Sequence, residues 1–311
     1  MRAFTLLTLG IGVLVGLQPA WAAGPSVNSV DRASVPGAQP PAAEQLGEVV
    51  GSFDFPNPPI PPNPPYHSLT GLEHDGDGNL YCADWTENPL AKQFFVVTPD
   101  EPTAQLIDGP VDVQAHTGSP GGITAVANHV YIADVIPAEV DVYDLAGGYL
   151  ASFLVQPHTF WPRGLTYSRI TRHLYVVDGQ DLGRVSEFDL NGNWVQDFNT
   201  LNGSSHDGLA FDPERCSYWL YDSGTDMVRH YDLNFVEMES FAGPAARGFG
   251  LGDGVAVIGD RLYVMSTMSP VSGWPTVVIF DVADAMVSDL CSIFEDGFES
   301  GDASAWSSVT P

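Results

Sequence analysis

The sequence predicts an all-β protein, a β-propeller of four-stranded blades. The segment 204–241, SSHDGLAFDPERCSYWLYDSGTDMVRHYDLNFVEMESF, contains four short apolar runs separated by turns. Such runs are strands that are too small to fold alone, so they need neighbouring copies of the same unit. Two further observations agree with this prediction. The pattern recurs along the chain, and the 311 residues include 32 Gly and 25 Pro, a composition rich in turns.

The second strand of each repeat is its clearest marker. An apolar-Tyr-x-x-Asp signature occurs five times, with one copy altered to YWLYD and the last to LYVMS. The copies are spaced by 50, 44, 44 and 44 residues and end at Asp84, Asp134, Asp178, Asp222 and Ser266. A Gly-apolar pair precedes each copy, and a third strand such as VDVYD or VVIFD follows it. Four strands at this period are typical of a propeller blade. Helical repeats are excluded because the apolar runs are short, β-branched and aromatic.

The N-terminal strand is predicted to close the ring. The fourth strand ends in Phe153, Phe198 and Phe241 in three repeats, and VVGSF, ending at Phe53, matches it from a position ahead of the first repeat. The last repeat has no comparable fourth strand of its own. We therefore expect the segment ending at Phe53 to complete the last blade and to pair an otherwise open edge. Counting gives five blades, or six if a degenerate repeat has escaped the count.

The two ends of the chain differ from the repeats. Residues 1–22 combine a basic start, an apolar run and a small-x-small site, which predicts a cleaved secretory signal peptide. Residues 23–44 are rich in Ala, Pro and Ser and predict a disordered leader. Residues 45–291 form the expected propeller, and residues 292–311 an acidic tail. We therefore expect a secreted or periplasmic protein, and no later segment is long and apolar enough for a membrane span.

The net charge and the cysteine content limit the kinds of ligand and the cellular compartment that we expect. The formal net charge of −28 repels nucleic acid and anionic lipid, so we expect a small-molecule, peptide or protein ligand. The acidic residues form either a solvated shell or, in part, a set of Ca²⁺ ligands. Export permits a disulfide. Cys216 and Cys291 are the expected pair, and Cys82, inside an apolar strand, is the expected buried free thiol.

Two repeats carry a family resemblance: GLAFDPERCSYWLYDSGTDMVRHYDLN and GLTYSRITRHLYVVDGQDLGRVSEFDLNGN. They resemble NHL-type and gluconolactonase-like propeller repeats, and the similarity covers about residues 45 to 285. The resemblance implies a fold that hosts hydrolases, lyases and binding proteins alike. The tail, with IFEDGFESGDASAW, resembles short C-terminal extensions on exported proteins of Gram-negative bacteria. That likeness implies sorting or surface retention, the alternative being a flexible end without a task.

The loops that enter the first strands are the expected place for a ligand site, because they crowd one face around the propeller axis. They carry seven polar or aromatic candidates: His67, His116, Trp161, Arg163, His206, Asp207 and Asp253. The first hypothesis is a binding or scaffold propeller that presents a ligand site on this face, with no catalytic residue.

The second hypothesis is a divalent-metal-dependent hydrolase of lactones or esters. The family resemblance implies cation ligands at the residue just before the glycine of successive first strands, and Asp207 and Asp253 stand there. The other three equivalent positions hold Thr70, Gly121 and Arg163, and no glutamate matches the family's further ligand near the first blade. The structural alternative is that both aspartates accept backbone hydrogen bonds at strand starts.

Three further patterns complete the candidates. Convergence of His67, His116 and His206 would suit zinc with one open position, so Ca and Zn are the two cations considered. The DGDGN segment from Asp75 to Asn79 resembles a Ca²⁺ loop without its downstream Glu, and we expect a hairpin turn. The repeated aspartates that end the second strands are expected to bond neighbouring loop backbone.

Overall fold

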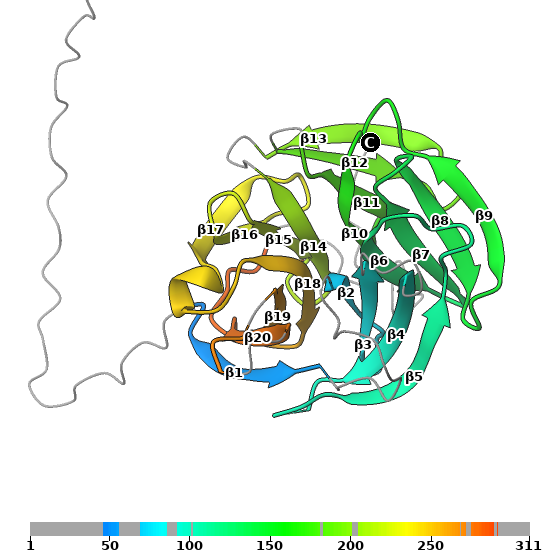
Figure 1. Cartoon of the computed structure of the whole chain (residues 1–311). Coiled ribbons are helices and arrows are strands. Elements are labelled where there is room, and N and C mark those ends of the chain that lie inside the picture. The colour runs from blue at the N-terminus through cyan, green and yellow to red at the C-terminus, as the bar shows by residue number, and fades with distance from the viewer. Residues whose placement is uncertain are drawn as a thin grey trace, which may run out of the picture. The chain divides into compact units, whose positions relative to one another are not determined.

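The computed structural model describes residues 46–55, 69–85, 92–100, 102–180, 183–200, 205–267, 269–271, 275–288 and 291. Five four-stranded antiparallel sheets stand around a common axis as the blades of a β-propeller (Figure 1). In the described residues the one helical element is a 3-10 turn, Ala245–Arg247, and no helix is long and apolar enough to span a membrane. The predicted signal peptide, leader and tail fall outside the described residues.

Each blade runs from an inner to an outer strand, and the strand bounds are as follows. Blade 1 contains β2 (Leu69–His74), β3 (Leu80–Trp85), β4 (Lys92–Thr98) and β5 (Gln105–Asp112). Blade 2 contains β6 (Pro120–Val126), β7 (His129–Asp134), β8 (Glu139–Asp144) and β9 (Tyr149–Leu154). Blade 3 contains β10 (Pro162–Ser168), β11 (His173–Asp178), β12 (Arg184–Phe188) and β13 (Trp194–Asn199). Blade 4 contains β14 (His206–Asp212), β15 (Ser217–Asp222), β16 (Met227–Tyr231) and β17 (Glu237–Ala242). Blade 5 contains β18 (Gly252–Ile258), β19 (Arg261–Ser266), β20 (Thr276–Asp281) and, from the start of the chain, β1 (Val49–Asp54).

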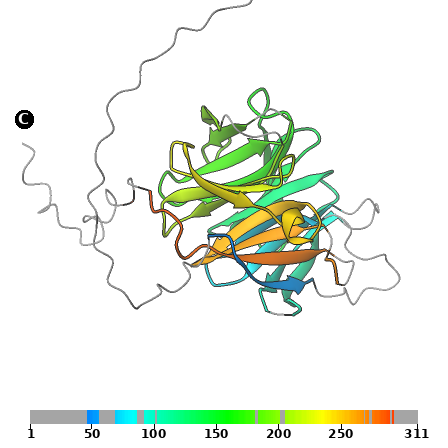
Figure 2. The ribbon, with the colours of Figure 1, turned by 90° about the vertical axis from the view of Figure 1, so that its left-hand side faces the viewer.

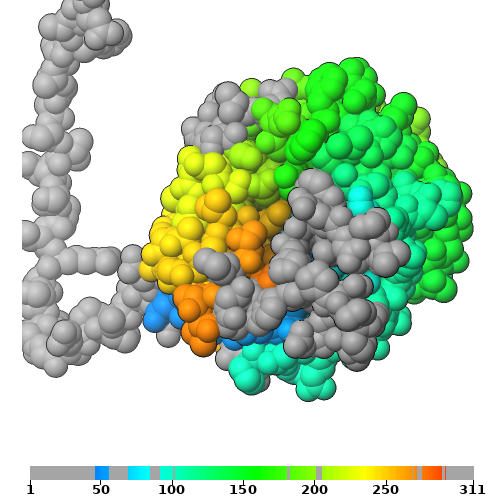
Figure 3. Space-filling model, viewed as in Figure 1, coloured from blue at the N-terminus to red at the C-terminus, as the bar shows by residue number. Residues whose placement is uncertain are grey.

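The inner strands touch one another around the axis, and their glycines allow it. A Cβ at Gly71 would lie 2.6 Å from the carbonyl oxygen of Gly121, and one at Gly164 would lie 2.7 Å from the backbone nitrogen of Leu209. Backbone of the next blade therefore fills the place of a side chain, which only glycine permits. The apolar residue after each glycine packs between blades, where Leu72, Ile123, Leu165, Leu209 and Val255 are all buried. The Gly-apolar pairs of the sequence therefore mark the residues at which neighbouring blades contact each other. Figure 3 shows the colours passing around the ring from cyan to orange in chain order.

Ring closure by the N-terminal strand is confirmed. β1 pairs antiparallel with β20, with Phe53 opposite Val277, and the side chain of Phe53 is 1% exposed. Thr276 Oγ1 donates a further hydrogen bond to the carbonyl oxygen of Phe53, 2.8 Å away. Figure 2 shows β1, in blue, beside the orange strands of blade 5. The count of five blades is confirmed as well.

The cysteine and turn predictions are also confirmed. Cys216 and Cys291 form a disulfide, and Cys82 is a buried free thiol. Asp75 Oδ1 accepts the backbone N–H groups of Asp77 and Asn79, so the DGDGN segment is the turn between β2 and β3. The carboxylates that end β7, β11 and β15 accept backbone N–H groups of the entry loops, as at Asp134, Asp178 and Asp222.

Candidate functional site

Three charged side chains meet at the entry end of the axis, and we call this group the entry triad: Arg163, Asp207 and Asp253. They come from three successive inner strands, β10, β14 and β18, at the residue just before the glycine of each Gly-apolar pair. Arg163 Nε lies 3.7 Å from Asp207 Oδ1, and Arg163 Nη1 lies 3.9 Å from Asp253 Oδ2. One guanidinium is therefore at ion-pair distance from both carboxylates.

Burial changes the proton affinity of the two acids. Their side chains are 10% and 14% exposed, and burial raises the pKa of both Asp207 and Asp253 above the ordinary value. The charge of Asp207 raises the pKa of Asp253 further, whereas Arg163 lowers both. Asp253 Oδ1 is buried and has no hydrogen-bond partner within the described ranges. A buried acceptor left unpaired is costly, so this atom is the natural place for a donor from outside the chain.

Trp161 lies next to the entry triad, just before β10, the strand that carries Arg163. A Cβ added at Gly179, just after β11, would lie 2.6 Å from Arg163 Cγ and 3.1 Å from Trp161 Cδ1. The two side chains therefore flank the same glycine. Gly179 also donates its N–H to the carbonyl oxygen of Trp161, 2.9 Å away, which fixes the loop.

The predicted histidines have other contacts. The ring of His116 is exposed and stacks on Tyr149, an outer-strand residue of blade 2, with ring centroids 3.8 Å apart. The ring of His206 is buried, and its Nε2 lies 2.8 Å from Thr200 Oγ1. Burial lowers the pKa of His206 to about 4, so this ring is neutral near pH 7. His67 lies outside the described residues.

The fit of a metal to the entry triad depends on Arg163. A cation held jointly by Asp207 and Asp253 would have to stand close to the guanidinium that already pairs with both. Like charges at such a distance repel strongly where side chains are buried. Asp207 and Asp253 beside Arg163 therefore suit a ligand that donates hydrogen bonds better than they suit a bare divalent ion.

A second group, which was not among the predicted site residues, lies towards the exit end of the axis. Glu73 of β2 is buried and accepts hydrogen bonds from Thr166 Oγ1 at 2.7 Å and Thr124 Oγ1 at 3.3 Å. Its carboxylate therefore ties blade 1 to blades 2 and 3. A cavity of about 40 Å³ opens beside it, lined also by Tyr167 and Arg169. That volume holds a few water molecules, since one needs about 10–15 Å³ by this measure.

The aligned repeats contain a signal that would have found Glu73. It stands two residues after the glycine of β2, where the other inner strands carry Thr124, Thr166, Ala210 and Ala256. A carboxylate among small or hydroxyl side chains at a repeated, axis-lining position marks a departure from the structural pattern. Burial raises the pKa of Glu73 to about 7, and its hydrogen bonds with Thr166, His74 and Thr124 limit the rise.

Glu73 should make the stability of the propeller depend on pH. Between the ordinary pKa of 4.5 and about 7, the folded chain keeps a proton that the unfolded chain has released. The free energy of unfolding therefore falls as pH rises through this window. Glu73→Gln mimics the protonated form, so we expect little change at pH 5 and a gain of about 1–3 kcal/mol at pH 8.

Urea unfolding of wild type and Glu73→Gln at both pH values measures this gain. Asp77→Asn, in the exposed turn after β2, serves as the control and should show no comparable pH-dependent difference. A Glu73→Gln variant that loses stability equally at pH 5 and pH 8 would contradict a raised pKa.

Comparison with known proteins supports the fold. No family model and no curated protein matches the chain. Among solved structures, the glutaminyl cyclase of Myxococcus xanthus is similar at 11% identity and a TM-score of 0.54, covering 76% of this chain and 97% of that one. A nidogen/laminin complex is also similar, at 19% identity and a TM-score of 0.48, covering 71% and 78%. At 11% identity the likeness to the cyclase concerns the fold alone.

Proposed function

We propose that this protein is an exported binding propeller that holds a ligand ammonium group at the entry triad. The observation that carries the proposal is the buried, unpaired Oδ1 of Asp253 beside a second carboxylate, Asp207. A bound ammonium group would favour the ionised form of both acids, and in that form the triad has one negative charge in excess of the guanidinium of Arg163. An ammonium group supplies that missing charge and up to three N–H donors.

Trp161 supports the same ligand chemistry. It lies beside Arg163 at the mouth and is half-buried, so an indole surface adjoins the residue that pairs with both carboxylates. Aromatic faces attract cations and also cover the apolar part of an amine. A small amine or the amino group of a peptide therefore fits better than an acidic ligand. With the export expected from residues 1–22, the protein would meet such a ligand outside the cytoplasm.

The metal-dependent hydrolase is the weaker hypothesis. That chemistry needs a metal to polarise a carbonyl and a separate acid–base group to move protons. Asp207 and Asp253 are the two ligands that the gluconolactonase-like resemblance implies, and Arg163 pairs with both of them. The propeller fold itself hosts enzymes and binding proteins, so the side chains at the mouth decide between the hypotheses.

A thermal-shift panel tests the proposal. The probes are lysine, putrescine and choline chloride, with sodium acetate and glucose as ligands that lack an ammonium group. At about 100 times its Kd a ligand adds roughly 2.7 kcal/mol, which corresponds to a Tm increase of several degrees for a domain of this size. We expect at least one primary amine to raise Tm, and Asp253→Asn to lose most of that increase.

Two controls sharpen the result. Asp284→Asn changes an exposed acid beyond the end of β20 and should keep the full response. Elemental analysis of the purified protein tests the hydrolase hypothesis independently. A stoichiometric divalent metal that is lost in the Asp207→Asn/Asp253→Asn double variant would contradict the ammonium proposal and favour the hydrolase. An amine response that survives in Asp253→Asn would also contradict the ammonium proposal.

A further inference from the structure

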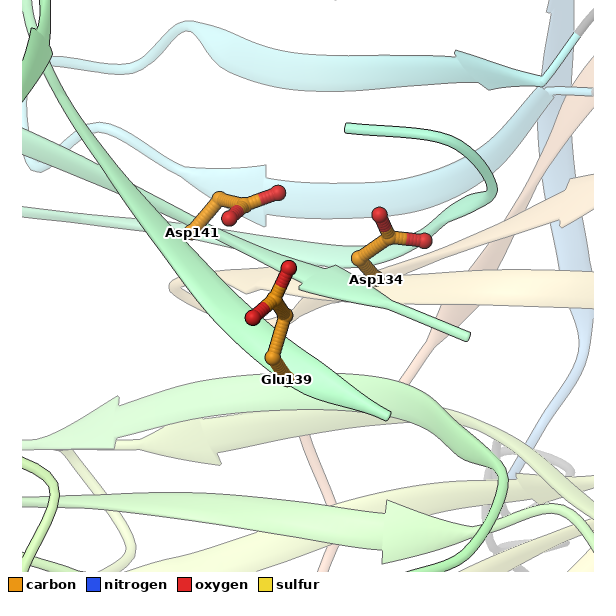
Figure 4. A group of neighbouring side chains, drawn as sticks. All are labelled: Asp134, Glu139 and Asp141. Carbon is orange, nitrogen blue, oxygen red and sulfur yellow. The ribbon is translucent and has the colours of Figure 1, made fainter. Parts of the chain in front are cut away.

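A second cluster of acids lies in blade 2, away from the entry triad. Asp134 ends β7, and Glu139 and Asp141 follow on the neighbouring strand β8. Glu139 pairs directly with Asp134 across the ladder, and Asp141 is two residues further on, so the three side chains share one face of the blade. One carboxylate oxygen from each lies within 4.8 Å of the other two. Figure 4 shows the three side chains as neighbours on β7 and β8.

Two of these acids are almost completely buried. Asp134 is 0% exposed, and its two oxygens accept the backbone N–H groups of Gly118 and Ser119 at 2.6 and 2.8 Å. Asp141 is 1% exposed, and its Oδ2 accepts the hydroxyl of Thr117 at 2.6 Å. The other oxygen of Asp141, Oδ1, is buried without a hydrogen-bond partner in the described part of the chain. An unpaired carboxylate oxygen that belongs to an acidic cluster indicates a missing partner.

The other blades show what that partner should be. In blade 4, Asp222 takes the place of Asp134, and Arg229 takes the place of Asp141, with Arg229 Nη2 3.7 Å from Asp222 Oδ2. In blade 1, the residue opposite Asp84 is Gln93, whose Nε2 donates to Asp84 Oδ2 at 3.2 Å. Each of these blades supplies its buried aspartate with a cation or an N–H donor from the third strand.

Blade 2 has the opposite arrangement. The same third-strand positions carry Glu139 and Asp141, so two acids stand where blade 4 has Met227 and Arg229. Across the residues that the structure describes, no Lys, Arg or His forms an ion pair with Asp134, Glu139 or Asp141. The carboxylates thus lack the charge that the equivalent arginine brings to Asp222.

We propose that Asp134, Glu139 and Asp141 form a Ca²⁺ site in blade 2. Ca²⁺ binds oxygen ligands at about 2.3–2.6 Å, so two oxygens on one ion lie at most about 5 Å apart. The separation of the three carboxylate oxygens meets that limit. Mg²⁺ requires about 2.0–2.1 Å and near-ideal octahedral geometry, which three fixed side chains on two strands satisfy less easily. Glu139 is half-buried, so water can complete the coordination from its side.

Electrostatics in the chain agree with this geometry. The three carboxylates offer oxygens within 4.8 Å of one another, so they repel one another when ionised. A bound divalent cation offsets that repulsion and favours the ionised carboxylate. The site is independent of the entry triad, so it can hold whether or not the triad binds an amine.

Calorimetric titration of CaCl₂ into chelator-stripped protein at pH 7.5 and constant ionic strength tests the site. We expect one equivalent of Ca²⁺ to bind and to raise Tm, with MgCl₂ at the same ionic strength having a smaller effect. Glu139→Gln and Asp141→Asn should each weaken Ca²⁺ binding at least tenfold. Without Ca²⁺, Asp141→Asn should be at least as stable as wild type, because a buried charge has been removed.

Matched variants separate this site from the rest of the molecule. Asp253→Asn alters the entry triad and Asp284→Asn an exposed acid, and both should bind Ca²⁺ as wild type does. Glu139→Gln changes a half-buried side chain, so it remains informative if Asp141→Asn folds poorly. The proposal is overturned if wild type binds no Ca²⁺ at millimolar concentration, if Glu139→Gln binds it unchanged, or if Asp253→Asn alone loses it.

Discussion

Deletion of residues 48–53 is expected to prevent the propeller from folding stably. The deletion removes most of β1, the strand that completes blade 5 and pairs with β20. It exposes the ladder groups of β20 and takes Phe53 out of a core cluster that also contains Tyr263 and Phe95. Loss of one buried Phe side chain costs about 3–5 kcal/mol, and domains have only about 5–15 kcal/mol of stability in total.

The single substitution Phe53→Ala isolates the packing part of this effect. We expect it to lower the free energy of unfolding by about 3–5 kcal/mol in urea denaturation. Val50→Ala, at an exposed position of the same strand, should change it by less than about 0.5 kcal/mol. Removal of residues 23–44 should likewise leave stability unchanged. A deletion of residues 48–53 with wild-type Tm would show that another strand closes the ring.

Arg215→Ala is expected to cost about 3–5 kcal/mol of unfolding free energy, because it leaves a buried carboxylate without its cation. Arg215 is buried and lies 3.2 Å from Asp212 through Nη1 and 2.6 Å from Asp260 through Nη2. Its Nη1 also donates to the carbonyl oxygen of Gly259, so the guanidinium joins blade 4 to blade 5. In this variant Asp212 still accepts the indole N–H of Trp219, but it no longer has a positively charged partner.

Thermal and urea unfolding measure this loss, with Arg261→Ala, an exposed arginine at the start of β19, as the control. Arg215→Ala/Asp212→Asn should recover part of the stability, since the unpaired charge is then absent. If Arg215→Ala unfolds with the wild-type free energy, the ion pairs of Arg215 contribute nothing net to stability.

The repeats explain why so much of the fold could be predicted. Each glycine of the Gly-apolar pairs is required by the approach of the next blade, and the aspartates that end β7, β11 and β15 hold entry loops. The glycine recurs in all five repeats and the aspartate in four of them, so the repeats of this one chain can be aligned with one another. Closure by the strand of Phe53 followed from the missing fourth strand of the last repeat.

Strand β5 shows where the pattern stops. It contains Gly109 and Pro110, and proline within an apolar run normally argues against a strand. The structure accommodates both residues with register shifts between β4 and β5, on the outer edge of blade 1. Irregular pairing of this kind depends on the neighbouring strand, so a reading of the segment alone could not locate it.

The candidate site was predicted less completely, because neighbouring residues of a strand face opposite ways. Asp207 contributes to the entry triad, whereas the ring of His206 bonds to Thr200 in the loop before β14. The register shifts between His206 and Gly208, which spacing along the sequence does not reveal. Glu139 and Asp141 reach Asp134 only through the pairing of β7 with β8. Ligand and metal roles for these residues stay predictions.

The disulfide also determines how the folded chain would carry mechanical load. Cys216 and Cys291 are 75 residues apart in sequence, and they bracket most of blade 4 and the three later strands of blade 5. Tension applied between the two ends of the chain would pass through the sulfur atoms and bypass that segment. The segment between the two cysteines, about 260 Å long if fully extended, would then not be stretched. Under such tension the oxidised propeller would unfold from β1 and from blades 1 to 3, while the segment between the two cysteines would bear no load.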